Sequence, residues 1–222
     1  MPVPPEQTKK QLQEARRAEK VASYKKQQSR EKRNRRLAII GASVGGAAVI
    51  ALVVTFIVVS SVPKPDPSTI KIADVQTWDD LPATHVEGAV DYQTEYGMNP
   101  PAGGEHNQVW LNCGVYTEPQ TNENAVHALE HGAIWATYDA AKVSDDELSK
   151  LEGELPNSYV VVSPYVGLPS PIVISAWGAQ IEVTDASDPR IEQFVNKYWK
   201  SALLAEQGAA CTGGIDGPGK VS

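Results

Sequence analysis

All four histidines of the chain lie between positions 85 and 131. His127 and His131 occur in the segment VHALEHG, for which we expect a helix. Residues at i and i+4 share one face of a helix, so both imidazoles can reach the same cation. His106 follows the glycine-rich segment PPAGGEH, whose turn can fold its side chain back to the same place. The spacing predicts a transition-metal site, copper or zinc, with His106, His127 and His131 as ligands.

Two residues compete for a fourth ligand position. Met98 offers a soft thioether that suits copper, whereas His85 offers a further imidazole. For each histidine taken alone, a structural role is the alternative. His131 at a helix C-terminus would cap carbonyl groups and interact with the helix dipole, and His127 would be a hydrogen-bonded core residue.

The segment from His127 to His131 also matches H-x-x-E-H, the inverted zinc-peptidase motif. In a peptidase, Glu130 would be catalytic and would activate water. The match is short, and Gly132 would end the helix at once, whereas those peptidases need a distant acidic third ligand on a long helix. We therefore assign no catalytic residue outside the peptidase hypothesis, and expect Glu130 to orient a ligand histidine.

An uncharged stretch separates a basic N-terminal segment from an acidic remainder. Residues 1–36 contain 12 Lys/Arg and four Asp/Glu. The remaining chain contains eight Lys/Arg and 23 Asp/Glu. Residues 37–62 carry no charge, and a helix of that length extends roughly 39 Å, enough to cross a hydrocarbon core of about 30 Å. A cleaved signal peptide is the alternative, but its apolar region is shorter. We predict an uncleaved, single-pass anchor in the cell membrane, with the N-terminus cytoplasmic.

This charge distribution also limits the partners that we expect. A basic segment next to a membrane span suits anionic lipid headgroups, and we favour this interpretation over nucleic-acid binding. The chain has no phosphate-binding loop, dinucleotide fingerprint, G-x-S-x-G or C-x-x-C-H motif. The lipid membrane is therefore the expected partner, and no nucleic acid is expected.

Both cysteines, Cys113 and Cys211, follow the predicted span. Outside the membrane they can form a disulfide. Such a bridge would close a loop of about 99 residues, which the loop-entropy model values at ~4–5 kcal/mol. The alternative is that Cys113 is a thiolate ligand of a metal, and we favour the disulfide.

We divide the chain into a basic cytoplasmic tail (1–36), a transmembrane signal-anchor helix (37–62), a Pro-rich linker (63–69) and an extracytoplasmic domain (70–222). In that domain, hydrophobic periodicity predicts three helices and five strands in an order that does not alternate strictly. This order favours an α+β fold, a single domain with helices packed on a mostly antiparallel sheet. The helices are expected over 122–131, 144–155 and 188–205, the strands over 107–116, 133–138, 159–163, 172–177 and 180–183, and irregular chain over 208–222.

Four blocks of the domain resemble a bacterial family known as domain of unknown function 3105. They are PPAGGEHNQVWLNCGVY, VHALEHGAIWATY, SPYVGLPSPIVISAWG and ACTGG, within residues 85–214. The architecture is similar to that of membrane-anchored members with a basic cytoplasmic tail. The resemblance implies that the family pattern includes His106, His127, Glu130, His131, Cys113 and Cys211. By analogy it supports both the metal site and the disulfide.

The function that we favour is a membrane-anchored extracytoplasmic domain that binds copper or zinc. A hypothesis of another class is a non-catalytic accessory subunit of an envelope or respiratory membrane complex, such as an oxidase. Tryptophans are frequent interface anchors, and four candidates are Trp110, Trp135, Trp177 and Trp199. The metallopeptidase is the third hypothesis.

Overall fold

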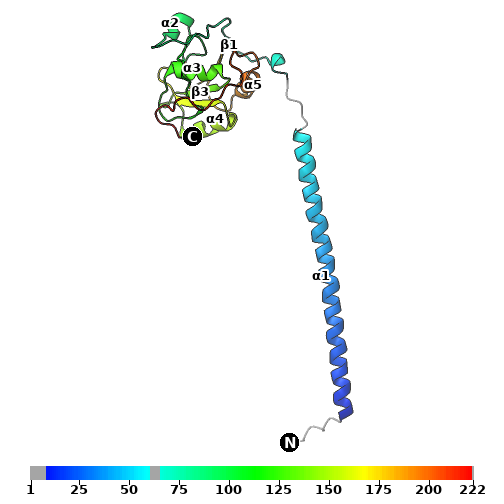
Figure 1. Cartoon of the computed structure of the whole chain (residues 1–222). Helices are drawn as coiled ribbons and strands as arrows, with labels where there is room; N and C mark the ends of the chain where they lie inside the picture. The colour runs from blue at the N-terminus through cyan, green and yellow to red at the C-terminus, as the bar shows by residue number, and fades with distance from the viewer. Residues whose placement is uncertain (1–8, 61–65, 222) are drawn as a thin grey trace. The chain divides into compact units, whose positions relative to one another are not determined.

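The computed structural model describes residues 9–60 and 66–221, which divide into two compact units on either side of residues 64–65 (Figure 1). In the first unit, helix α1 (Lys9–Ser60) joins the basic segment and the apolar stretch without a break. Within the described residues, α1 is the helix long and apolar enough to cross a membrane. Its apolar side chains, such as Leu52 and Phe56, are exposed, as a lipid-facing helix requires. The last two residues of the predicted span, 61 and 62, lie outside the described residues.

The second unit is built on a six-stranded sheet with the order β1-β6-β5-β3-β4-β2. The β1–β6, β6–β5 and β5–β3 pairs are antiparallel, and β3–β4 and β4–β2 are parallel. This arrangement confirms the α+β fold, and it places β3 at the centre of a mixed sheet. The strands are β1 (Gln76–Thr77), β2 (Gly114–Val115), β3 (Ile134–Tyr138), β4 (Val160–Pro164), β5 (Ile172–Ala176) and β6 (Ala179–Val183).

Helices cover both faces of the sheet, because the side chains of each strand alternate between the faces. Ile134 of β3 packs in one cluster with Leu151 and Phe194, whereas Trp135 packs in another with Leu129. Figure 1 shows α3 and α4 on opposite sides of β3. Thus α3 (Asn122–Glu130) covers one face, and α4 (Asp145–Glu154) and α5 (Pro189–Tyr198) cover the other. Two short helices complete the unit: η1 (Pro67–Thr69) precedes β1, and α2 (Tyr92–Tyr96) lies between β1 and β2 in the chain.

Two expected elements are shorter than predicted. The prediction of a strand over 107–116 was wrong for most of that range, because the backbone there forms hydrogen bonds outside the sheet. Leu111 N–H donates to Asn124 O and Asn112 N–H donates to Ile215 O, both at 2.8 Å. Only β2 remains. The helix expected over 188–205 ends at Tyr198, where the backbone becomes extended. The irregular C-terminal segment is confirmed over 208–221, and its bridges pair Ile215 and Lys220 with the chain before α3.

The turn after α3 depends on a glycine. Gly132 has φ +98°, and a Cβ built there would lie 3.0 Å from Lys200 Cα. We expect Gly132→Ala to lower the free energy of unfolding by more than about 1 kcal/mol, because alanine fits neither the angle nor the space. The measurement is chemical unfolding of the full chain in detergent, followed by tryptophan fluorescence.

Gly153→Ala provides the matched control. Gly153 lies inside α4 with nothing within 4 Å of its built Cβ, so alanine there should stabilise the domain by about 0.5–1 kcal/mol. Equal effects at the two positions would show that the turn after α3 imposes no such constraint.

Candidate metal centre

His85 and His106 lie on two loops that are joined by backbone hydrogen bonds. His106 N–H donates to Thr84 O at 3.1 Å, and Val86 N–H donates to His106 O at 2.8 Å. These bonds form an isolated parallel bridge between the two histidines. The imidazole rings consequently lie edge to face, with their centroids 4.9 Å apart.

The loop before His106 turns tightly through two glycines. Gly103 and Gly104 have φ +141° and +103°, and built Cβ atoms would lie 2.6 Å from Leu81 Cδ1 and 2.8 Å from Tyr96 Cε2. Larger residues would therefore be strained there and would also collide with their neighbours. The turn places the His106 ring 4.8 Å from that of His127, centroid to centroid, as the PPAGGEH segment predicts.

Helix α3 supplies the other two histidines and a glutamate. His127 and Glu130 lie in its last turn and His131 is its C-cap, so the predicted helix is present over these residues. The rings of His127 and His131 meet edge to face with centroids 4.6 Å apart. The buried side chains are those of His106, His127, Glu130 and His131, whereas His85 is exposed.

Each buried histidine has its Nδ1 atom against a backbone carbonyl. The acceptors are Gly104 O for His106, Asn107 O for His127 and Ala210 O for His131, at 2.8, 2.7 and 2.8 Å. A carbonyl can only accept, so these bonds assign the proton to Nδ1 in each ring. In neutral His106 and His127 the lone pair is then on Nε2, the arrangement in which histidine binds metals. His131 differs, because its Nε2 also donates to Glu206 Oε2 at 3.0 Å.

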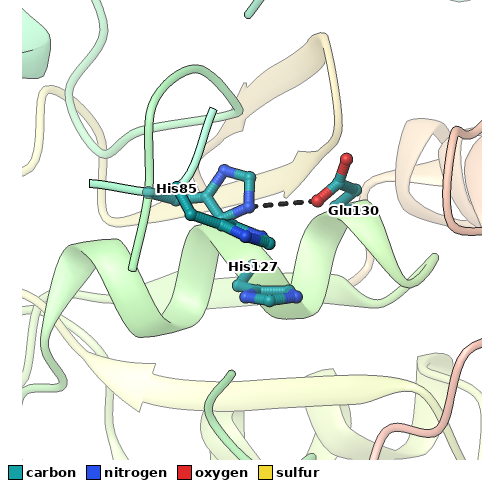
Figure 2. A group of neighbouring side chains, drawn as sticks. His85, His127 and Glu130 are labelled. Carbon is teal, nitrogen blue, oxygen red and sulfur yellow. Dashed lines mark ion pairs between the residues drawn. The ribbon is translucent and has the colours of Figure 1, made fainter. Parts of the chain in front are cut away.

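Four of these residues form what we call the inner group: His85, His106, His127 and Glu130. Each offers a ligand atom, and the four atoms lie within 4.8 Å of one another. Figure 2 shows His127 and Glu130 projecting from α3, with His85 coming from a neighbouring loop. The group combines three imidazoles with one carboxylate, a donor set that binds borderline divalent metals.

Two ligand atoms of the inner group have no hydrogen-bond partner among the described residues. His106 Nε2 lies 3.0 Å from Glu130 Oε2, and the two side chains are 0% and 4% exposed. The relative orientation of the two groups does not give a hydrogen bond between them. Neither atom has another hydrogen-bond partner in the part of the chain that the structure describes. In the neutral tautomer a lone pair would face a carboxylate oxygen, which is unfavourable in a buried place. A cation between the two atoms would satisfy both.

A second set, the outer group, consists of His127, His131 and Glu206. Their ligand atoms also lie within 4.8 Å of one another. Glu206 Oε2 lies 3.0 Å from His131 Nε2 and 3.7 Å from His127 Nε2, and the Glu206 side chain is 42% exposed. Sequence reasoning missed Glu206, because it lies 75 residues after His131 in a segment that matches no motif.

Electrostatics keep His127 suited to binding a cation. Burial lowers the pKa of His127, and the neighbouring imidazoles of His106, His131 and His85 lower it further. The hydrogen bond to Asn107 O opposes this change but does not outweigh it. At neutral pH a metal ion would therefore have no proton to displace from His127.

Met98 packs in an apolar cluster with Tyr92, Ala102 and Val126, and its Sδ accepts a hydrogen bond from Ala102 N–H at 3.3 Å. Its role as a ligand stays a prediction. The structure confirms the Cys113–Cys211 disulfide, with the two Cα atoms 5.4 Å apart, so Cys113 is not a thiolate ligand.

Two tryptophan rings lie beside three of the histidines. The Trp110 ring lies 5.0 Å from His131 and 5.7 Å from His127, and the Trp177 ring lies 5.6 Å from His106, between centroids. Trp135 is fully buried in the core, so it is not an interface anchor within this fold. The rings reduce the access of water, which strengthens any electrostatic interaction at the site.

Comparison with known proteins shows that the site lies inside the region matched by a family model. A family model described as Protein of unknown function (DUF3105) matches residues 85–213. That range is more than half of the 222 residues and includes both groups and both cysteines. No curated protein and no solved structure matches the chain significantly.

Proposed function

Because the chain belongs to the family described as Protein of unknown function (DUF3105), a description that names no activity, we propose its function from the site itself. The domain binds one transition-metal ion in the inner group. The observation that carries the proposal is the buried, unsatisfied contact between His106 Nε2 and Glu130 Oε2. His127, with Nδ1 held by a carbonyl, offers a third ligand atom to the same place.

The donor set selects among metals. Three imidazole nitrogens and one carboxylate oxygen suit zinc or copper(II), which we propose as the ions bound. Copper(I) prefers sulfur ligands, but both cysteine sulfurs form the disulfide and Met98 Sδ accepts a hydrogen bond from Ala102 N–H. Calcium and magnesium prefer oxygen ligands, and Glu130 is the one residue of the inner group that offers oxygen.

We propose that the ion is held outside the cell membrane. The apolar part of α1 supports a membrane anchor, and the basic residues before it support a cytoplasmic N-terminus. The disulfide supports an oxidising compartment for the domain. A partner such as a respiratory oxidase, and the accessory-subunit role, stay predictions.

The environment of Glu130 favours a ligand over a catalytic base. A base must reach a water molecule next to the substrate, whereas the Glu130 side chain is 4% exposed and faces His106. Glu130 therefore contributes a metal bond or orients His106 in this proposal, and peptidase activity is not needed to explain it.

The test is metal retention by the full chain in detergent. The protein is loaded with zinc or copper(II), freed of excess by dialysis, and analysed for metal. We expect about one equivalent in the wild type, and an affinity lowered about tenfold or more in Glu130→Gln. Glu154→Gln, an exposed glutamate of α4, is the matched control and should retain the wild-type amount. A folded wild type that retains neither metal would refute the proposal.

A further inference from the structure

The inner and outer groups share a residue, and this sharing has a functional consequence. We propose that the outer group of His127, His131 and Glu206 is the position at which the ion is loaded and released, and that the ion passes to the inner group by ligand exchange around His127. The inference rests on the proposed function, because it concerns the route of the same ion.

A single ligand atom links the two groups. His127 Nδ1 is occupied by Asn107 O at 2.7 Å, so only Nε2 is free to bind a metal. One lone pair makes one metal bond, so both groups cannot hold an ion with a complete ligand set at the same time. The two groups are therefore alternative positions for one ion.

The two positions differ in which ligand is exposed. Each group has one exposed ligand, which is the imidazole of His85 in the inner group and the carboxylate of Glu206, with a side chain 42% exposed, in the outer group; the inner group also holds the pair His106 and Glu130, 0% and 4% exposed. An exposed carboxylate attracts cations from solution, and replacing its bound water by the ion costs little free energy. The buried pair holds the ion more strongly, because electrostatic interactions are stronger away from water.

The exchange balances with water as the only other reactant. The bonds from the ion to Glu206 and His131 break as bonds to His106 and Glu130 form, while the bond to His127 Nε2 is kept. His106 and His127 keep their Nδ1 protons throughout. The proton that His131 Nε2 donates to Glu206 Oε2 passes to water when the ion is loaded, and is taken up again from water when the ion moves to the inner group. The oxidation state of the ion does not change.

The C-terminal segment holds the outer group in place. Ala210 O accepts from His131 Nδ1–H at 2.8 Å, and the next residue, Cys211, is bonded to Cys113. Tyr159 also donates through its hydroxyl to Ala209 O at 2.9 Å. Glu206 therefore comes from a segment that is anchored close behind it, which keeps its carboxylate near the histidines.

The test measures rates separately from affinity. Copper(II) is mixed with the full chain in detergent, and binding is followed by quenching of tryptophan fluorescence, since Trp110 and Trp177 lie beside the two groups. Release is followed after addition of a chelator. We expect Glu206→Gln to slow both binding and release about tenfold, while the stoichiometry stays at one and the dissociation constant changes far less.

Glu192→Gln is the control, because Glu192 is an exposed glutamate on α5 and should leave both rates unchanged. His131→Gln should slow the rates in the same direction as Glu206→Gln. Unchanged rates in folded Glu206→Gln would overturn the route and would indicate that the ion passes the exposed His85 instead. Two equivalents in the wild type would overturn the alternative occupancy. A wild type that binds no copper or zinc would refute the proposed function itself. That result is distinct from unchanged rates in Glu206→Gln and from two bound equivalents in the wild type.

Discussion

Replacing His127 by glutamine should reduce the retained metal from about one equivalent per chain to about one tenth or less. Among the ligands, His127 belongs to both the inner and the outer group, so its loss damages both positions of the ion. Losing one imidazole from a buried four-ligand site also leaves the remaining donors without a complete coordination shell. The measurement is metal content after loading and dialysis of the full chain in detergent.

His85→Gln is the informative comparison, because His85 is the exposed member of the inner group and is absent from the outer group. It should weaken retention while leaving measurable binding. The far-ultraviolet and near-ultraviolet circular dichroism of both variants should match the wild type, because glutamine at 127 keeps a hydrogen-bond donor for Asn107 O and because His85 is exposed. A folded His127→Gln protein that retains a full equivalent would contradict the assigned ligand set.

The second large effect concerns the disulfide. Replacing Cys113 and Cys211 together by serine should lower the free energy of unfolding by about 2–5 kcal/mol. The bridge spans 98 residues of sequence, so its loss gives the unfolded chain a large additional freedom. Denaturant unfolding followed by tryptophan fluorescence provides the measurement, because all five tryptophans lie in the second unit.

Reduction of the wild type provides the matched control for the double variant. Wild type in a thiol reductant should unfold at the same denaturant concentration as the double serine variant, and the reductant should not change the variant. The C-terminal segment keeps the backbone bridges of Ile215 and Lys220, so the folded domain should persist without the bridge. An unchanged midpoint in the variant would show that these bridges alone hold the segment.

The sequence predicted those elements in which local signals agree. Helix α4 begins after Ser144, whose side chain accepts from Glu147 N–H at 3.3 Å, as its capping pattern indicated. The i and i+4 spacing of His127 and His131 likewise predicted their adjacency on α3. In both cases the interaction lies within one turn of helix, so the residues involved are close in sequence.

Long-range pairing explains what sequence reasoning missed. The alternating residues of 107–116 suggested a strand, but hydrogen bonds to α3 and to the C-terminal segment replace most of that strand. Glu206 reaches His131 through the fold alone, across 75 residues, and no local pattern marks it. The carbonyl groups that fix the Nδ1 protons belong to residues of ordinary type, so their identity cannot reveal their role.

The ligand residues come from separate loops, and this has a consequence for folding. The inner group joins His85, His106 and α3, and the outer group joins α3 and Glu206, so an ion in either position would act as a reversible cross-link between segments that are separated in the chain. A ligand that binds only the native state stabilises it by about 4 kcal/mol when its free concentration is a thousandfold above the dissociation constant. The stability of the folded domain would then rise with the metal concentration around it, so that the metal-free chain would be the form more open to proteolysis.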